Sequence, residues 1–261
     1  MVRFRVNDLR HVNEHTGTDK VTTHSINIPD ALRCAACGAL LIDGYYFIHG
    51  RRERYCARCI RERDRCDVCS APLGNRYWTL HDGRRLCETC HATAIYDPLV
   101  ARQLFDETVA AIVAQLGMAL RVGVDFRLVD APTLAAVRAQ DKPPQPGEAP
   151  ALGLYQRHGR LRVIYMLYGL PRLLFRTVVA HEYAHAWQGE NCPLLSDHDL
   201  IEGFAEWVAY HHLGYLGSHK AAAAMRESNH PYRPLLERML ALEAQIGPAG
   251  VLEYMRRAGV R

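Results

Sequence analysis

The chain lacks the apolar segments that membrane and secreted proteins need. No apolar run among its 261 residues reaches the ~18 residues of a membrane-spanning helix. The opening residues, MVRFRVNDLRHVNEH, contain no apolar stretch of the kind found in a secretory signal. The net charge of +4 at pH 7 is too small to indicate nucleic-acid binding by itself. We therefore expect a cytoplasmic protein without a membrane partner.

Cysteine, by contrast, is abundant and regularly spaced. Eight of the nine cysteines form four C-x-x-C pairs: Cys34/Cys37, Cys56/Cys59, Cys66/Cys69 and Cys87/Cys90. Without a secretion signal, a disulfide framework is not expected. Four thiolates form a closed tetrahedral zinc site, so eight predict two structural zinc ions. Reduced structural cysteines or redox pairs are the alternative. The ninth, Cys192, we interpret as an incidental thiol.

The spacing of the pairs favours two tandem modules. The gap inside the first four cysteines is 18 residues long, and the gap inside the last four is 17. Grouping the first four and the last four is the simplest partition, and an interleaved, RING-like partition is the alternative. Each module also carries an aromatic strand and a turn that contains His49 or His81. We interpret both histidines as turn residues, not as metal ligands.

The tandem modules resemble a LIM domain, a double zinc module that binds proteins. They depart from the usual LIM pattern in the six-residue spacer between Cys59 and Cys66, and in a first site that has cysteine in place of histidine. Residues 51–65 contain seven arginines against three acidic residues. We interpret them as a solvated face with i,i+4 ion pairs. A patch for nucleic acid or an acidic partner is the alternative.

The second half of the chain predicts an α+β fold, in which a small sheet precedes several helices. From Pro171 onward the pattern is helical, with Pro171 at a first helical position and Gly189 at a helix end. The preceding segments predict a helix over 97–120, a strand over 124–130, a Pro-rich loop over 140–150 and a hairpin over 152–167.

The segment VVAHEYAHAW, residues 178–187, places polar residues in the middle of a helix that otherwise reads as core. His181 and His185 are four residues apart and project from one face, with Glu182 beside them. In this H-E-x-x-H pattern the two imidazoles bind zinc and the glutamate acts on water. A chance match on a solvent-exposed face is the alternative for five residues alone.

A following segment, LIEGFAEWVAYHH, supports the metal-site interpretation. Glu202 is separated from His185 by 16 residues and lies on a second predicted helix. A glutamate there can complete a His-His-Glu site and leave a fourth position for water. E-G-F-A-E resembles the second motif of gluzincin peptidases, in which the first glutamate is the ligand. That resemblance implies that Glu206 supports a ligand histidine, and we expect Gly203 to let the two helices approach closely.

Longer segments narrow the resemblance. LYGLPRLLFRTVVAHEYAHAW, IEGFAE and GPAGVLEYMRRAGV resemble the peptidase part of the plant LIM-linked growth regulators, the ubiquitin-activated DA peptidases. The resemblance covers roughly residues 31–261 and implies zinc ligands at His181, His185 and Glu202, with Glu182 as catalytic base. Residues 1–30 show no ubiquitin-interacting helix, which suggests a shorter relative that could be bacterial.

These patterns together predict a zinc endopeptidase. We expect an extension over 1–30, a LIM-like double zinc module over 31–93 for recognition or regulation, and a gluzincin-type peptidase domain over 94–261. The cofactors are then three zinc ions, one catalytic and two structural. The expected partners are a protein or peptide substrate and, from the resemblance, ubiquitin or a ubiquitinated protein. An edge of the 152–167 hairpin could pair with an extended substrate.

Two other functions stay open from the sequence alone. The first is a protein-binding scaffold whose zincin fold is only structural, and the second is nucleic-acid binding through the Arg-rich module. The presence of Glu182 favours the enzyme. The donor to the tetrahedral oxyanion is open among four candidates, namely Tyr210, His211, His212 and Tyr215.

Overall fold

The computed structural model describes residues 9–12, 33–42, 44–48, 51–141, 150–159, 161–227 and 231–259. The chain divides into two compact units, one within Val6–His91 and the other containing Ala92–Arg261. His49 lies outside the described residues, so its interpretation as a turn residue stays a prediction. Over the described part of the chain, no helix has the length and apolar character that crossing a membrane requires.

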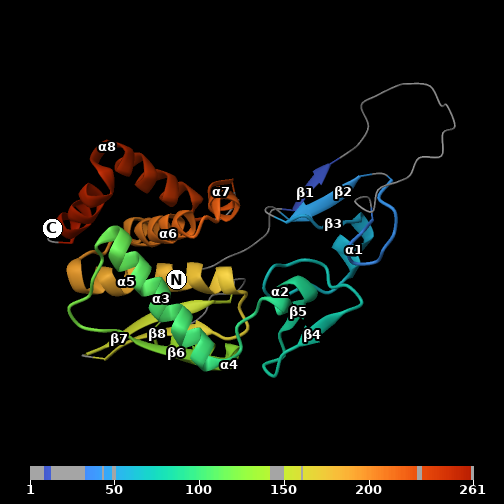
Figure 1. Ribbon diagram of the computed structural model, residues 1–261, viewed down its shortest axis with the longest axis horizontal. Coiled ribbons are helices and arrows are strands. Elements are labelled where there is room, and N and C mark those ends of the chain that lie inside the picture. Colours follow the sequence, from blue (N-terminus) through green and yellow to red (C-terminus); the bar gives the residue numbers. More distant parts are fainter. Residues whose placement is uncertain are drawn as a thin grey trace. The chain divides into compact units, whose positions relative to one another are not determined.

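The first unit consists of short strands and helices around the cysteine pairs (Figure 1). β1, β2 and β3 form an antiparallel sheet in that order, and β4 pairs with β5 as an antiparallel hairpin. The elements are β1 (Leu9–Val12), β2 (Tyr45–Ile48), β3 (Arg54–Tyr55), α1 (Ala57–Glu62), β4 (Tyr77–Thr79), β5 (Arg85–Cys87) and α2 (Glu88–Ala92).

The two halves of this unit repeat the same local structure, as their spacing predicts. The Cys34 amide donates to the carbonyl of Ala39 at 2.8 Å, and the Cys66 amide donates to that of Ala71 at the same distance. Each bond closes the tight turn that follows the first cysteine of a C-x-x-C pair. The turn between β4 and β5 contains His81, which is the position expected for it.

The second unit is a mixed three-stranded sheet covered by helices. β8 is central, parallel to β6 and antiparallel to β7, so β7 is an edge strand. This mixture of helices and small sheets confirms the α+β expectation. The elements are α3 (Pro98–Leu116), β6 (Asp125–Val129), α4 (Ala131–Asp141), β7 (Gly153–His158), β8 (Leu161–Leu167), α5 (Arg172–Asn191), α6 (His198–Tyr215), α7 (His219–Glu227) and α8 (Arg233–Ala258).

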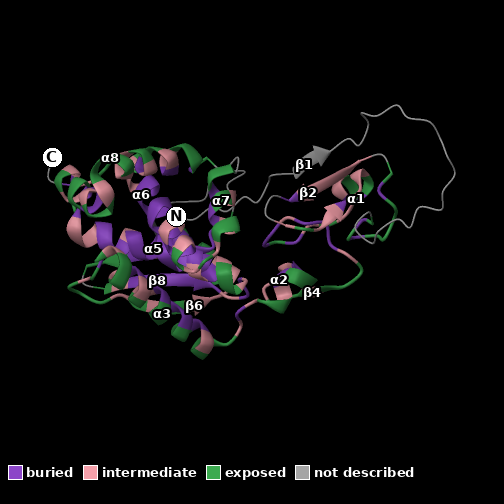
Figure 2. Ribbon diagram, turned by 45° about the horizontal axis from the view of Figure 1, so that its top comes forward, coloured by how far each residue is buried: buried purple, intermediate pink, exposed green. Residues whose placement is uncertain are grey.

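Helix α5 is the centre of this unit. It packs on β7 and β8, α6 packs on α5, and α8 packs on α6 (Figure 1). Figure 2 shows that α5, α6 and β8 are largely buried. Because α5 is covered by the sheet on one side and by α6 on another, its apolar residues do not form a single narrow stripe. Phe175, Val178 and Trp187 are all buried on it.

Several element ends differ from the sequence prediction. α3 ends at Leu116, not at residue 120, because Gly117 adopts a left-handed conformation with φ 68°. Helix α4 was not anticipated, and it extends to Asp141, inside the segment expected to be a loop. The rest of that expected loop, residues 142–149, lies outside the described residues.

Three positions were interpreted wrongly for reasons that only packing reveals. Pro171 is the N-cap of α5 and precedes its first helical residue. Gly189 does not end the helix, which continues to Asn191; a Cβ there would lie 3.2 Å from the Tyr155 hydroxyl. Gly203 does not face α5, as the expected close approach of α5 and α6 would require. A Cβ at that position would lie 3.1 Å from the Leu235 carbonyl oxygen, so the close approach is to α8.

A buried histidine on α6 predicts acid sensitivity. His212 is 1% exposed, and neither ring nitrogen has a hydrogen-bond partner among the residues that the structure describes. Burial lowers the pKa of His212 from 6.5 to about 4, and the nearby charge of Arg176 adds to this shift. Between these values the unfolded chain binds a proton that the folded chain does not, so stability is lost as the pH falls from about 6.5 to about 4.

The variant His212→Leu should remove this contribution. Over that pH range, the free energy of unfolding of the parent chain should fall by about 3 kcal/mol more than that of the variant. Urea unfolding of both chains at pH 7 and pH 4.5, with zinc in excess, measures the difference. Equal losses would mean that His212 is hydrated or hydrogen-bonded in solution.

Candidate metal centres

Helices α5 and α6 bring three potential metal ligands together in the core. Ligand atoms of His181, His185 and Glu202 all lie within 4.8 Å of one another. The Oε2 atom of Glu202 is 3.4 Å from His181 Nε2 and 3.9 Å from His185 Nε2. Both imidazoles therefore present the same ring nitrogen to one carboxylate oxygen, and this group could hold a metal ion.

The opposite ring nitrogens are oriented by other side chains. His181 Nδ1 lies 3.4 Å from Oε1 of Glu206, and His185 Nδ1 lies 2.9 Å from Oε1 of Gln188. The Gln188 amide in turn donates to the Ile201 carbonyl at 2.9 Å. Such outer contacts fix ring orientation and tautomer in metal sites. Gln188 was not identified from the sequence; its i,i+3 spacing from His185 was the available signal.

The charges in this cluster are consistent with a divalent cation. His181 is fully buried, and Glu202 and Glu206 are each 5% exposed, so two carboxylates share an apolar environment. Burial opposes a charge on His181, but the two carboxylates outweigh it and raise the pKa of His181. Burial and the neighbouring His181 hold the pKa of His185 well below its usual range. A bound dication would compensate the carboxylates and leave both imidazoles neutral.

Glu182 lies beside the cluster and is fixed by the edge strand of the sheet. It is 1% exposed, and its Oε2 accepts a hydrogen bond of 2.8 Å from the backbone N–H of Tyr155 on β7. This approach requires the glycine at position 153. A Cβ there would lie 2.6 Å from Val178 Cγ1 and 3.0 Å from Glu182 Cγ. The sheet therefore sets the position of the Glu182 carboxylate.

The four candidate oxyanion donors lie on α6 beyond Glu202. His211 Nε2 lies 2.9 Å from Oε2 of Glu243 on α8. Tyr210, His211 and Tyr215 line a cavity of about 680 Å³ whose described lining comes from α3, α6, α7 and α8 and includes none of the three clustered ligands. His212 is buried elsewhere in the core.

The structure places one further histidine at the cluster. The side chain of His198, at the start of α6, is 70% exposed, and its Nε2 lies 3.8 Å from Oε1 of Glu202. Glu202 therefore has one oxygen towards the paired histidines and the other towards His198. Sequence reasoning missed this residue, although the i,i+4 spacing from Glu202 was visible.

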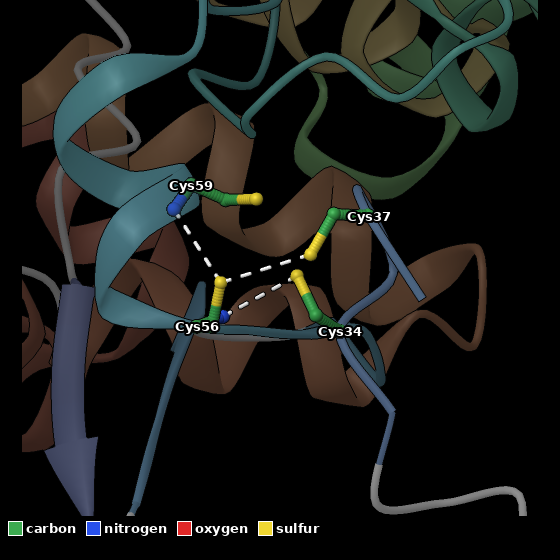
Figure 3. A group of neighbouring side chains, drawn as sticks. All are labelled: Cys34, Cys37, Cys56 and Cys59. Carbon is green, nitrogen blue, oxygen red and sulfur yellow. Dashed lines mark hydrogen bonds between the residues drawn. The ribbon is translucent and has the colours of Figure 1, made fainter. Parts of the chain in front are cut away.

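The eight paired cysteines form two groups, as the tandem partition predicts, and not the interleaved alternative. Cys34, Cys37, Cys56 and Cys59 converge in one group, and Cys66, Cys69, Cys87 and Cys90 form the other. Figure 3 shows the four sulfurs of the first group directed towards one another. All nine cysteines are free thiols. Each group could hold a metal ion.

Backbone amides stabilise the thiolate form at equivalent positions of the two groups. The Cys56 amide lies 3.4 Å from Cys34 Sγ, and the Cys87 amide lies 3.3 Å from Cys66 Sγ. Burial alone would raise the pKa of Cys34, but backbone N–H groups lower it to about 7. Hydrogen bonding from Cys69 lowers the pKa of Cys66 to about 7. Burial raises the pKa of Cys59, and the neighbouring sulfurs raise the pKa values of Cys69 and Cys90. What suits both groups to zinc is therefore the convergence of four sulfurs on one point.

The remaining cysteine differs from these eight. Cys192 is 3% exposed, and burial raises its pKa to about 11. Such a thiol is neither a good nucleophile nor a ready metal ligand.

Residues 151–235 match the family described as DA1-like: Protein DA1. That segment contains all five clustered residues of α5 and α6, namely His181, Glu182, His185, Glu202 and Glu206.

Three proteins of Arabidopsis thaliana are similar to this chain. Protein DA1 is 26% identical over 60% of the chain, Protein DA1-related 2 is 24% identical over 70%, and Protein DA1-related 1 is 28% identical over 52%. The matches span 36%, 48% and 31% of these relatives, so the chain spans between about a third and a half of their length. No solved structure matches the chain. Residues 151–235 are thus similar to the DA1-like family, and longer parts of the chain are similar to these three relatives.

Proposed function

We propose that the chain is a zinc-dependent endopeptidase of the gluzincin type. His181, His185 and Glu202 would hold the catalytic zinc, and Glu182 would act as the base. The observation that carries this proposal is the convergence of two imidazoles and a carboxylate in the core, with a second carboxylate held beside them by β7. A purely structural metal site needs no extra carboxylate at that position.

The residues of the site divide the chemistry among them. Zinc, when bound, supplies a Lewis acid that polarises the scissile carbonyl and acidifies a water molecule. Glu182 takes a proton from the attacking water and delivers it to the leaving amine. The Tyr155 amide holds one oxygen of Glu182 in place during both transfers. Glu206 and Gln188 keep the ligand imidazoles in one orientation.

The edge strand β7 is suited to bind the substrate. Among the described strands it pairs with β8 alone, and it lies against α5 at Glu182. An extended peptide that adds to this edge would place a backbone carbonyl near the metal site. We further propose residues 31–93 as a LIM-like module for recognition or regulation and residues 94–261 as the peptidase domain. Ubiquitin or a ubiquitinated protein is a proposed partner of this arrangement, carried over from the family resemblance.

The variant Glu182→Gln tests the function. The amide can accept the Tyr155 hydrogen bond but cannot carry a proton, so zinc should be retained and peptide cleavage should be lost. The assay measures zinc content and cleavage of a library of internally quenched peptides. Glu253→Gln, on the surface of α8, is the matched control and should behave as the parent chain. Equal cleavage by the Glu182→Gln variant, or none by the parent, would contradict the proposal.

The two glutamates of α6 should differ in what they contribute. Glu202→Ala removes a metal ligand and should abolish tight zinc binding at this site. Glu206→Ala removes only a contact to His181 and should weaken zinc affinity by ~10–100-fold. Competition with a fluorescent zinc chelator measures both affinities. Loss of the metal in Glu206→Ala alone would reverse the two roles.

His198 is the candidate oxyanion donor with a contact to the metal site. Loss of such a donor lowers kcat by ~100-fold or more, with little change in zinc affinity. His198→Ala should show this pattern, and His198→Gln, which retains an N–H donor, should recover part of the rate. His211→Ala serves as the comparison, because His211 is bound to Glu243. A larger loss of kcat in His211→Ala would favour that residue as the donor.

A further inference from the structure

Several arginines of the Arg-rich segment are half-buried and not part of a solvated face, and Arg51 is the one that contacts cysteine sulfurs. Arg58 forms the expected i,i+4 pair with Glu62 at 2.9 Å, and both side chains are exposed. Arg51, in contrast, is half-buried, and its guanidinium contacts the second cysteine group. Its Nη2 lies 3.1 Å from Cys90 Sγ and its Nη1 lies 3.9 Å from Cys87 Sγ.

This contact joins the two halves of the first unit. Arg51 precedes β3 and belongs to the first repeat by sequence, whereas the cysteines that it contacts belong to the second repeat. Thr89 adds to the same junction, since its hydroxyl donates to Oε1 of Glu53 at 3.0 Å. Two side chains of the segment before β3 are therefore fixed against the second cysteine group.

A comparison of the two repeats shows that an arginine occupies this position in the first repeat and not in the second. Arg51 is five residues before Cys56, and the residue five before Cys87 is Asp82. Asp82 has the opposite charge, and its Oδ2 accepts a hydrogen bond of 2.8 Å from Nε of Arg84. The second repeat therefore does not return an arginine to the first cysteine group from this position.

The two cysteine groups also differ in burial. In the first group Cys37 is exposed and Cys56 is half-buried, so water can reach the sulfurs. In the second group Cys66, Cys69 and Cys90 are at most 3% exposed and Cys87 is 9% exposed. A divalent ion with four thiolates carries a net charge of −2, which is costly to hold away from water without a cation. Arg51 is a cation placed at that group.

The first repeat in turn positions Arg51. The Ala35 amide, in the turn after Cys34, donates to the Arg54 carbonyl at 2.8 Å and so ties the first C-x-x-C turn to β3. The Arg51 amide donates to the Ile48 carbonyl at 3.0 Å at the end of β2. The backbone on both sides of Arg51 thus depends on the fold around the first cysteine group.

We propose that Arg51 is a component of the second metal site, supplied by the first repeat, and that metal retention at the second site depends on an intact first site. By linkage, zinc at the second site then supports the first site by the same coupling free energy. The double module then behaves as one unit in which the first metal organises the second site. This inference does not depend on the proposed peptidase activity.

Zinc release from the full chain tests the proposal. Zinc-loaded protein is mixed with excess 4-(2-pyridylazo)resorcinol, and Cys66→Ser identifies the release phase of the second site. Arg51→Ala should accelerate that phase by ~10–100-fold and leave the first-site phase unchanged. Arg51→Lys should lie between, since an ammonium keeps the charge without the two-pronged geometry. Arg52→Ala, an exposed neighbour, is the matched control and should release zinc at the parent rate.

The coupling of the two sites needs a second pair of variants. Cys37→Ser, which weakens the first site, should also accelerate release from the second site. Cys69→Ser, which weakens the second site, should likewise lower the zinc affinity of the first site, because a coupling free energy is reciprocal. The proposal fails if Arg51→Ala releases zinc at the parent rate, if it accelerates both phases equally, or if Cys37→Ser leaves release from the second site at the parent rate.

Discussion

The buried carboxylate of Glu202 is the contact on which the second unit depends. It lies between two helices that are separated in sequence and faces imidazoles on the other helix at 3.4 and 3.9 Å. A charge in this position is tolerated only with compensation, which a protonated His181 supplies as a hydrogen-bond donor or which a bound cation would supply. The packing of α6 on α5 therefore also sets the geometry of the candidate metal site.

The sheet, which packs on another side of α5, also fixes part of the site. β7 approaches so closely that position 153 must be glycine, and its backbone amide holds Glu182. The Glu182 carboxylate is thus fixed by a backbone amide of the sheet.

The cysteine groups of the first unit are organised differently. Each is held by turns whose backbone amides face the sulfurs, and the equivalent bonds of Cys34 and Cys66 show that the two halves use the same local solution. The halves differ in one contact. Arg51 of the first repeat contacts a cysteine sulfur of the second repeat, whereas Asp82 of the second repeat pairs with Arg84. The two repeats therefore form one unit whose halves are not equivalent.

Local spacing was enough to predict much of this. His181 and His185 share a helix face by periodicity, and the C-x-x-C pairs define their groups by order. The contacts that depend on tertiary packing were not predictable: Gln188 and His198 join the cluster only once α6 lies on α5, and Arg51 only once the two repeats meet. From the sequence, Gly189 was expected to end a helix and Gly203 to let two consecutive helices approach. In the structure, a Cβ at Gly189 would meet Tyr155, and a Cβ at Gly203 would meet α8. Sequence signals identify such glycines without identifying what they face.

The central claim is that the core cluster of α5 and α6 is a third metal site, in addition to the two cysteine groups. Elemental analysis of zinc per chain, in the parent and in His185→Ala after removal of loosely bound metal, measures it most directly. The account predicts three zinc ions in the parent and two in the variant. Two zinc ions in both chains would contradict it.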